Sequence, residues 1–331
     1  MVGVLNVSGR SSLRAVASPF TRFSAFTLVA LVIAVVTALV IAMAVTIVLF
    51  EFRAPPERDA SAWHAYLTEE ELGHPLAKYW FRRAAPDSRV LSALNNGPLP
   101  SGDALKWEDR ERLIEPGYLG GENGWAKFDD GSAYVAVKTF FPGATAEMID
   151  WWFEWAQREE AIRYKIWYPG AHYDMSQAST PNAPTYKNPK PYWGKSRFPV
   201  EDVGVGVSQL RLDFVSPSEF GFDKLPEYST MLAVRVGLPN GLLKTTDMIH
   251  YVRPVEGGVE MRSRFWIARE FEAMAGGLGL AAFLADNPLV KSVVVPENLP
   301  QELALHCANE YAQLASFLPE VFALYGPQSL K

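Results

Sequence analysis

The hydrophobic pattern divides the chain into an uncharged apolar run near the N-terminus and a longer part in which apolar and polar positions alternate. Residues 23–50 contain no charged side chain and are rich in Val, Ile, Leu and Ala. At about 1.5 Å per residue, a helix of this length exceeds the roughly 30 Å hydrocarbon core of a bilayer. A cleavable signal peptide has a shorter apolar centre, of about 7–15 residues. The pattern therefore predicts one transmembrane signal anchor.

The residues on either side of this run predict its orientation. Residues 1–22 carry three arginines and no acid, whereas residues 51–60 carry charges of both signs and two prolines. The positive-inside rule then makes 1–22 a short cytoplasmic tail, 51–60 a linker and 61–331 a domain outside the cytoplasm. An acid-free start with Ser and Arg also fits a mitochondrial presequence, so the mitochondrial inner membrane remains an alternative location.

Beyond the linker, the pattern predicts several strands. Runs bounded by Pro-, Asn- and Gly-containing turns are typical of strands, and four segments have this character: 131–141, 229–238, 244–253 and 257–268. A helix is predicted over residues 144–161. Residues 173–198 are rich in Pro, Asn, Lys and Tyr, and we expect them to form a long loop.

The last long element is predicted to be an amphipathic helix over about residues 299–318, with Asn298 as a candidate N-cap. Its apolar stripe has helical spacing and consists of Leu299, Leu303, Cys307, Tyr311, Leu314 and Phe317. Antiparallel strands followed by a long helix indicate an α+β fold in which the sheet curls around that helix.

Two polar residues interrupt this stripe. His306 and Glu310 are four residues apart, so they lie on the same face of the helix. Glu310 falls inside the stripe and His306 at its edge. A carboxylate that faces a core is costly unless a proton, a cation or a metal compensates it. The pair therefore suggests two metal ligands, with a His–Glu hydrogen bond and no ligand as the alternative.

Composition and charge narrow the classes of function. The chain has 331 residues, of which 49% are hydrophobic, so it can bury one large core or two modest ones. The single cysteine, Cys307, excludes an internal disulfide and a thiolate-rich zinc site, and we expect it to pack in the core. The net charge is −6, and the part after the apolar run is more acidic still. Such a charge argues against nucleic-acid binding.

Several further strings occur in a fixed order along the chain. They are WWFEW, RYKIWYPGAH ending at His172, FPVEDVG around Glu201, HYVRPVEGGVEMRSRFW from His250, and the late H-x-x-x-E. Each string is weak by itself: a histidine after a turn is usually exposed, and the residues alone favour Glu201 as an exposed loop acid. Together they resemble the 2,4-diacetylphloroglucinol hydrolase family, which includes phloretin hydrolases. The resemblance covers roughly residues 65–325.

The resemblance implies a helix-grip fold, in which a curved antiparallel sheet wraps a long C-terminal helix and encloses a cavity. It also implies a zinc-dependent hydrolase that removes an acyl group from a polyhydroxylated aromatic ring. The implied metal ligands form one set: His172, Glu201, His306 and Glu310. His250 is the implied substrate-side histidine and Tyr164 the active-site tyrosine. His250 alternates with apolar neighbours on its strand and should face inward.

The implied reaction breaks a carbon–carbon bond. Zinc-activated water attacks the aryl ketone, and the ring carbon is protonated as the bond breaks, with His250 and Tyr164 as the expected proton carriers. Hydroxyls ortho and para to the acyl group make this possible, because the ring can take up its keto tautomer. The expected partner is therefore a small aromatic ketone. Iron or manganese in place of zinc, and the oligomeric state, remain open.

The chain departs from this family at two pocket positions. Phe265 stands where relatives have a second substrate-side tyrosine, and Met175 where they have an asparagine. Both changes remove hydrogen-bond partners, so we expect monoacyl ketones, or ketones with a longer apolar acyl group, to be preferred over a diacetyl substrate. The predicted membrane anchor is a third departure.

Alternatives remain for the domain and for some of its residues. A tethered carrier of an apolar aromatic or lipid ligand is the second interpretation of the whole domain. Trp151, Trp152 and Trp155 have helical spacing and are expected in the core instead of the cavity wall. Arg262 and Arg264 are expected to pair with Glu256 or Glu260.

Overall fold

The computed structural model describes residues 63–327, except 157–160, 180–184, 188, 242, 274–281 and 284, together with residues 34, 35 and 38. The predicted tail and linker, and nearly all of the predicted anchor at 23–50, lie outside the described residues. Among the residues that are described, no helix is both long and apolar enough to span a bilayer. The described residues from Trp63 onward belong to one compact unit, the domain.

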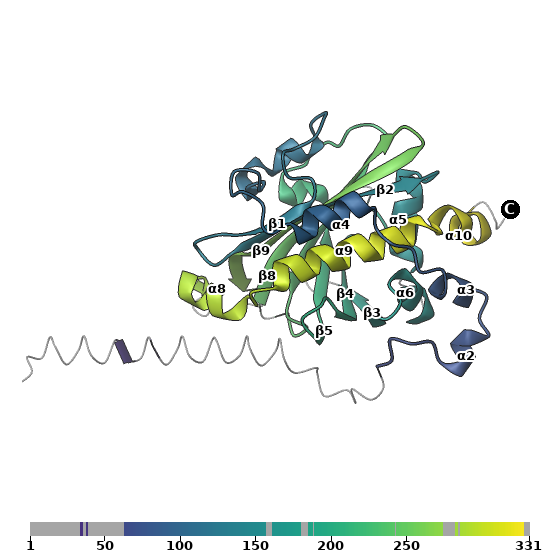
Figure 1. Ribbon diagram of the computed structural model, residues 1–331, viewed down its shortest axis with the longest axis horizontal. Helices are drawn as coiled ribbons and strands as arrows, with labels where there is room; N and C mark the ends of the chain where they lie inside the picture. The colour runs from purple at the N-terminus through teal and green to yellow at the C-terminus, as the bar shows by residue number, and fades with distance from the viewer. Residues whose placement is uncertain are drawn as a thin grey trace, which may run out of the picture. The chain divides into compact units, whose positions relative to one another are not determined.

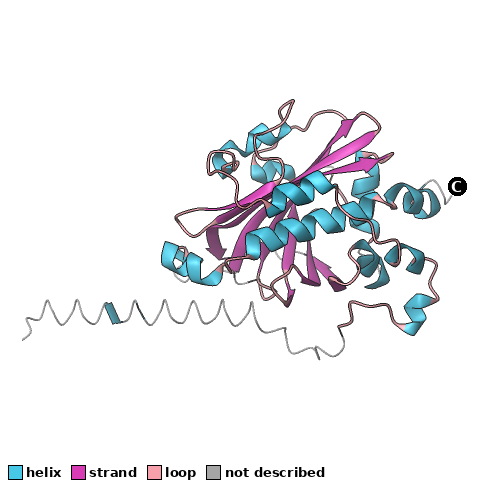
Figure 2. Cartoon of the chain, viewed as in Figure 1, coloured by secondary structure: helices cyan, strands magenta, loops and turns pink. Residues whose placement is uncertain are grey.

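One antiparallel sheet forms the centre of this domain (Figure 2). Its order is β1-β2-β9-β8-β7-β6-β4-β3, and β5 pairs with β4. Neighbouring strands all run antiparallel, and β9 makes the two longest pairings, with β8 and with β2. The nine strands are β1 (Gly124–Lys127), β2 (Ala133–Pro142), β3 (His172–Ser179), β4 (Lys195–Asp202), β5 (Val207–Gln209), β6 (Arg211–Val215), β7 (Thr230–Gly237), β8 (Leu243–Val255) and β9 (Gly258–Ala273).

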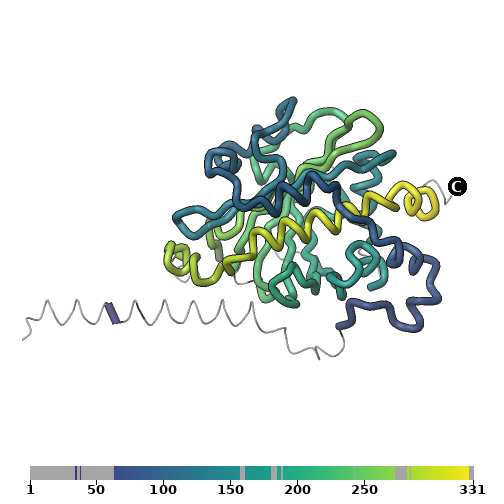
Figure 3. The backbone as a smooth tube through the Cα atoms, viewed as in Figure 1, coloured from purple at the N-terminus to yellow at the C-terminus, as the bar shows by residue number. Residues whose placement is uncertain are grey.

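The long C-terminal helix α9 (Leu299–Ala315) lies across the sheet (Figure 1). It packs mainly on β2 and β1, and the backbone trace shows α4 running alongside it (Figure 3). The other helical elements are α2 (Glu69–Leu72), α3 (Ala77–Trp80), α4 (Ser88–Asn95), η2 (Trp107–Ile114), α5 (Ala146–Trp155), α6 (Ala161–Trp167), η3 (Pro217–Phe220), α8 (Pro288–Val294) and α10 (Leu318–Tyr325). The predicted α+β class is confirmed.

Period-two alternation places two apolar cores on the two faces of the sheet. On β9, Phe265 belongs to the core between the sheet and α9, whereas Trp266 belongs to the core on the opposite face. Met248 and Ile249 divide in the same way on β8. Trp152 is fully buried in the first core, and none of the three tryptophans of α5 lines the cavity, as predicted.

Two predicted elements differ from the structure. The expected loop at 173–198 contains most of β3 and the start of β4, which pair from His172 with Glu201 to Ser179 with Lys195. The side chains of β3 after His172 are partly or fully exposed, so this edge strand lacks the apolar alternation that would reveal it. The predicted helix at 144–161 ends at Trp155, and α6 begins separately at Ala161. Asn298 precedes α9 but makes no side-chain capping bond.

The predicted partners of two arginines on β9 are wrong. Arg262 and Arg264 are almost fully buried, and both bind Glu122, at 2.5 and 2.7 Å. Glu260 pairs instead with Arg253, at 2.6 Å. Glu122 lies some 140 residues away in sequence, so nothing in the neighbourhood of the arginines indicates it. Burial would raise the pKa of Glu122, but hydrogen bonds from Arg262 and the two positive charges outweigh it and lower this pKa to about 2.

This cluster predicts acid sensitivity. Because the pKa of Glu122 is lowered in the folded state, its stabilisation is complete above the unfolded-state pKa of about 4.5 and is lost as pH falls towards 2. We expect Glu122→Gln to lower the free energy of unfolding at pH 7 by roughly 2–3 kcal/mol and to flatten its dependence on pH below 5. Denaturant unfolding at several pH values measures this. Glu297→Gln, which removes an exposed pair with Lys127, is the matched control. Parallel acid profiles of Glu122→Gln and wild type would contradict the assignment.

Candidate metal centre

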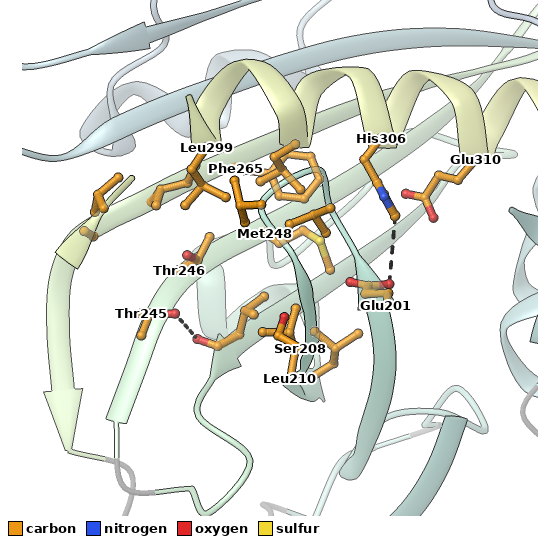
Figure 4. Close-up of a pocket in the computed structure, with 18 of the residues that line it drawn as sticks. Glu201, Ser208, Leu210, Thr245, Thr246, Met248, Phe265, Leu299, His306 and Glu310 are labelled. Carbon is orange, nitrogen blue, oxygen red and sulfur yellow. Dashed lines mark hydrogen bonds and ion pairs between the residues drawn. The ribbon is translucent and has the colours of Figure 1, made fainter. Parts of the chain in front are cut away.

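A cavity between α9 and the sheet contains the candidate site. One stripe of α9 lines it with Leu299, Leu303, His306 and Glu310, at spacings of four, three and four residues. The opposite wall comes from β8 and β9, including Met248 and Phe265. Figure 4 shows the imidazole and carboxylates at one end of this cavity and the aliphatic side chains at the other.

Four of the predicted site residues meet at the polar end. His172, the first residue of β3, is the pairing partner of Glu201 near the end of β4. Ligand atoms of His172, Glu201 and His306 all lie within 4.8 Å of one another. Glu310 stands at the edge of this group, with its Oε2 3.7 Å from His172 Nε2. The structure thus brings together one residue from each of two strands and two from one helix.

The two imidazoles are oriented as metal ligands usually are. His172 Nδ1 lies 3.1 Å from the carbonyl of Tyr164, and His306 Nδ1 lies 3.1 Å from the carbonyl of Asp202. Because a carbonyl only accepts, each Nδ1 must carry the proton, and each neutral ring then presents a lone pair on Nε2. These two Nε2 atoms face each other at 3.3 Å. Two lone pairs repel at this distance, so the arrangement calls for a shared cation.

Burial disfavours the charged forms of three side chains in this cluster. It lowers the pKa of His172 well below its ordinary value, helped by the neighbouring His306, whose own pKa is also lowered by burial. Burial and the charge of Glu201 raise the pKa of Glu310 well above its usual range. The imidazoles are therefore neutral, and Glu310 would hold a proton unless a cation took its place. A divalent ion bound by oxygen and nitrogen donors fits these side chains.

Tyr164 touches this cluster directly. Its hydroxyl donates a hydrogen bond to Glu201, and its ring stacks on that of His172 with centroids 3.9 Å apart and planes 7° apart. Burial, together with the charge of Glu201, raises the pKa of the Tyr164 hydroxyl well above its usual value. Tyr164 therefore remains protonated and fixes the orientation of both the carboxylate and the ring.

His250 lies in the cavity wall on β8, facing inward as predicted. Its Nδ1 is 2.8 Å from the hydroxyl of Ser263, and its Nε2 is 3.0 Å from the hydroxyl of Tyr311. Burial lowers the pKa of His250 to about 3, so the ring is neutral. Neither hydrogen-bond partner of His250 is predicted from the sequence, in which Tyr311 is only one member of the apolar stripe of the last helix. The pairing of Ser263 with His250 across the β8–β9 hairpin is the signal that could have found Ser263.

Met175 and Phe265, where the resemblance implies polar residues in relatives, both line the cavity. Met175 projects from β3, and Phe265 lies on β9 with its ring edge-on to His250 at a centroid distance of 5.7 Å. Neither side chain offers a strong hydrogen-bonding group. Cys307 packs in the core next to His306, as predicted, and does not line the cavity.

Comparisons with known proteins identify the family of the chain. Residues 105–323 match the model of the family described as the DAPG hydrolase PhiG domain. Phloretin hydrolase from Eubacterium ramulus is 32% identical over 270 residues, which cover 77% of this chain and 92% of that protein. A 2,4-diacetylphloroglucinol hydrolase from Pseudomonas sp is 28% identical over 268 residues, which cover 76% and 88%.

The similarity to solved structures is too weak to support the family assignment. Norcoclaurine synthase from Thalictrum flavum, in complex with dopamine and hydroxybenzaldehyde, aligns with 56% of this chain and 90% of its own at 10% identity and a TM-score of 0.28. A TM-score this low carries no weight. The family match spans about two thirds of the chain, and the match to phloretin hydrolase, at 32% identity, covers 77% of it. The chain therefore belongs to the family of the DAPG hydrolase PhiG domain.

Proposed function

We propose that this protein is a metal-dependent hydrolase that cleaves the carbon–carbon bond between an acyl group and a polyhydroxylated aromatic ring. The observation that carries the proposal is the pair of Nε2 atoms of His172 and His306, which face each other beside two carboxylates at one end of an apolar cavity. Relatives named as hydrolases of phloretin and of 2,4-diacetylphloroglucinol support the reaction type. A carrier of apolar ligands would have no need for such a cluster.

The chemistry of the donor set favours zinc. His172, Glu201, His306 and Glu310 would hold it, and two imidazoles with two carboxylates and no thiolate suit this ion. When bound, the metal would polarise the ketone oxygen and lower the pKa of a water molecule. The backbone carbonyls that hold both Nδ1 atoms would keep the imidazoles oriented for it.

The residues around the cluster would accept and donate the protons that the reaction moves. Hydrolysis adds the hydroxyl of water to the carbonyl carbon and leaves a proton on the ring carbon that loses the acyl group. His250 is neutral, with one ring nitrogen towards Ser263 and the other towards Tyr311, so it can accept a proton on one side and release one on the other. We assign proton delivery to the ring carbon to His250, and binding of a phenol oxygen to Tyr164.

Metal analysis of the purified full-length protein tests the proposal. We expect about one zinc ion per chain, released by a strong chelator with loss of activity towards acylphloroglucinols. A metal-free protein that is well folded and binds aromatic ketones without cleaving them would favour the carrier.

Substrate preference should follow from the two departures in the cavity. With Phe265 and Met175 in place of polar residues, a second oxygen-bearing substituent on the ring would lie against side chains that cannot satisfy it. We expect kcat/KM to be about 10- to 100-fold higher for monoacetyl- than for diacetylphloroglucinol, and Phe265→Tyr to reduce this ratio. A wild type that prefers the diacetyl compound, with no change in Phe265→Tyr, would show that these residues do not set specificity.

We also assign the domain to the helix-grip class. The support is the single antiparallel sheet with α9 packed across β1 and β2, and a cavity between the helix and the meander of β7, β8 and β9. The two ligands on α9 enter this cavity from the helix, opposite those on the strands.

A membrane anchor at residues 23–50 remains part of the proposal on sequence grounds. Its length, its lack of charge and the three arginines before it favour a catalytic domain outside the cytoplasm. Protease added to intact cells or spheroplasts should therefore degrade the domain. A domain that becomes accessible only after lysis would reverse the orientation, and the same assay on isolated mitochondria tests the alternative location.

A further inference from the structure

The cavity has two chemically different ends. Its ionisable lining side chains, among the described residues, gather around the metal ligands: Tyr164, Glu201, His250, His306, Glu310 and Tyr311. The rest of the lining is apolar except for a few hydroxyls. We call this part the apolar arm and define it by Met248, Phe265, Phe271, Val295, Leu299 and Leu303.

Helix α9 sets the length of the apolar arm. The stripe that carries Glu310 and His306 continues through Leu303 to Leu299 on the same face. Leu299 lies seven residues before His306, the nearest ligand on the helix, which at 1.5 Å per residue is a rise of about 10 Å. Figure 4 shows His306 and Glu310 at one end of this part of the helix and Leu299 at the other. The arm is therefore much longer than an acetyl group.

The floor of the arm changes in the same direction. Three successive cross-strand pairs of β8 and β9 lie along the cavity, and all of their side chains except that of Ser263 line it: His250 with Ser263, Met248 with Phe265, and Thr246 with Ile267. The first pair is polar and lies at the metal centre. The second is wholly apolar, and the third offers one hydroxyl beside an isoleucine. Each step of two residues moves away from the ligands, and neither of the later pairs carries an ionisable side chain.

Few polar groups lie at the far end. The hydroxyl of Thr245 is 3.4 Å from the carbonyl of Val236, and Thr246 supplies a second hydroxyl there, whereas Ser208 is the strand-pairing neighbour of Glu201 at the polar end (Figure 4). No charged side chain of the described residues lines this end. A polyhydroxylated ring placed here would leave most of its hydroxyls unsatisfied, whereas an alkyl chain would not.

We propose that the apolar arm binds an extended, unbranched alkyl chain on the acyl side of the ketone, so that the substrates are phenolic ketones with medium-length acyl chains. This inference rests on the proposed function, which puts the ketone at the metal centre. The ring then stays among the polar groups around His250, and the chain runs along α9 towards Leu299. Burial of each methylene group improves binding until the arm is full.

Binding of compounds that cannot be cleaved separates this inference from catalysis. Alkyl-substituted 1,3,5-trihydroxybenzenes, from methyl to decyl, lack the ketone. For the full-length protein we expect Kd to fall by up to about fourfold per methylene, as a transfer free energy of about 0.8 kcal/mol implies, and to level off at the longer chains. A Kd that does not depend on chain length would overturn the proposal.

Leu299→Trp tests where the chain lies. It fills the far end and should make Kd level off at a shorter chain, while the methyl compound binds as it does to wild type, which also shows that the variant is folded. Leu289→Trp, at an exposed position on α8 outside the cavity, is the matched control and should behave like wild type. A Leu299→Trp profile identical to that of wild type would contradict the placement along α9. A chain-length dependence in a protein that cleaves no acyl ketone would support the arm and refute the hydrolase.

Discussion

Replacing His306 with alanine is expected to lower metal affinity by at least about 100-fold and to abolish measurable cleavage. His306 Nε2 is one of two imidazole lone pairs directed at the same point, so its loss removes a ligand, whereas loss of an outer partner alone typically costs 10–100-fold. The variant should also be less stable, because Glu201 and Glu310 would be left close together without a compensating cation. Elemental analysis and the thermal midpoint measure the two effects.

Glu302→Gln is a suitable control on the same helix. Glu302 lies in the first turn of α9 and does not line the cavity, so its loss should leave metal content and activity unchanged. A His306→Ala protein that retains one metal ion per chain would show that the metal is bound elsewhere. The ligand set proposed for the cavity would then be wrong.

Replacing His250 with glutamine is expected to lower kcat by about 100- to 10,000-fold while metal content stays at wild-type level. Glutamine keeps a hydrogen-bonding side chain but cannot transfer a proton at neutral pH, and general acid–base catalysis typically contributes this much. Because His250 is not in the ligand cluster, the metal should remain. Steady-state kinetics on a monoacyl ketone, with metal analysis of the same sample, measures the effect.

Ser263→Ala provides the graded comparison. It removes the partner of His250 Nδ1 but keeps the imidazole, so kcat should fall by about 10-fold and the pH profile of kcat should change shape. If His250→Gln lost its metal, or if only KM changed, His250 would serve in binding or structure instead of proton transfer.

The two site residues on α9, His306 and Glu310, can be placed together from local sequence alone. An amphipathic stripe fixes which side chains share a face, so the spacing of His306 and Glu310 is enough to place them together. The β8–β9 hairpin is equally local, and alternation along its first strand predicts the inward-facing His250.

The two site residues on strands, His172 and Glu201, cannot be placed together from local sequence. His172 and Glu201 become neighbours only because β3 and β4 pair, and the polar, exposed side chains of β3 hide this strand from a periodicity argument. Glu201 precedes Asp202 and a glycine-containing turn, so the residues alone resemble an exposed loop. Only the family resemblance points to it. Likewise, the ion pair between Arg262 and Glu122 joins distant parts of the chain, so the pattern of charges along the sequence does not predict it.

Cleavage of monoacetylphloroglucinol in water labelled with oxygen-18 tests the central claim most directly. The account predicts that the metal-loaded protein releases acetic acid carrying the label and trihydroxybenzene without it, since the hydroxyl of water joins the carbonyl carbon and the ring gains only a proton. Recovery of intact ketone, or release of unlabelled acid, would contradict the assignment of this cavity as a carbon–carbon bond hydrolase.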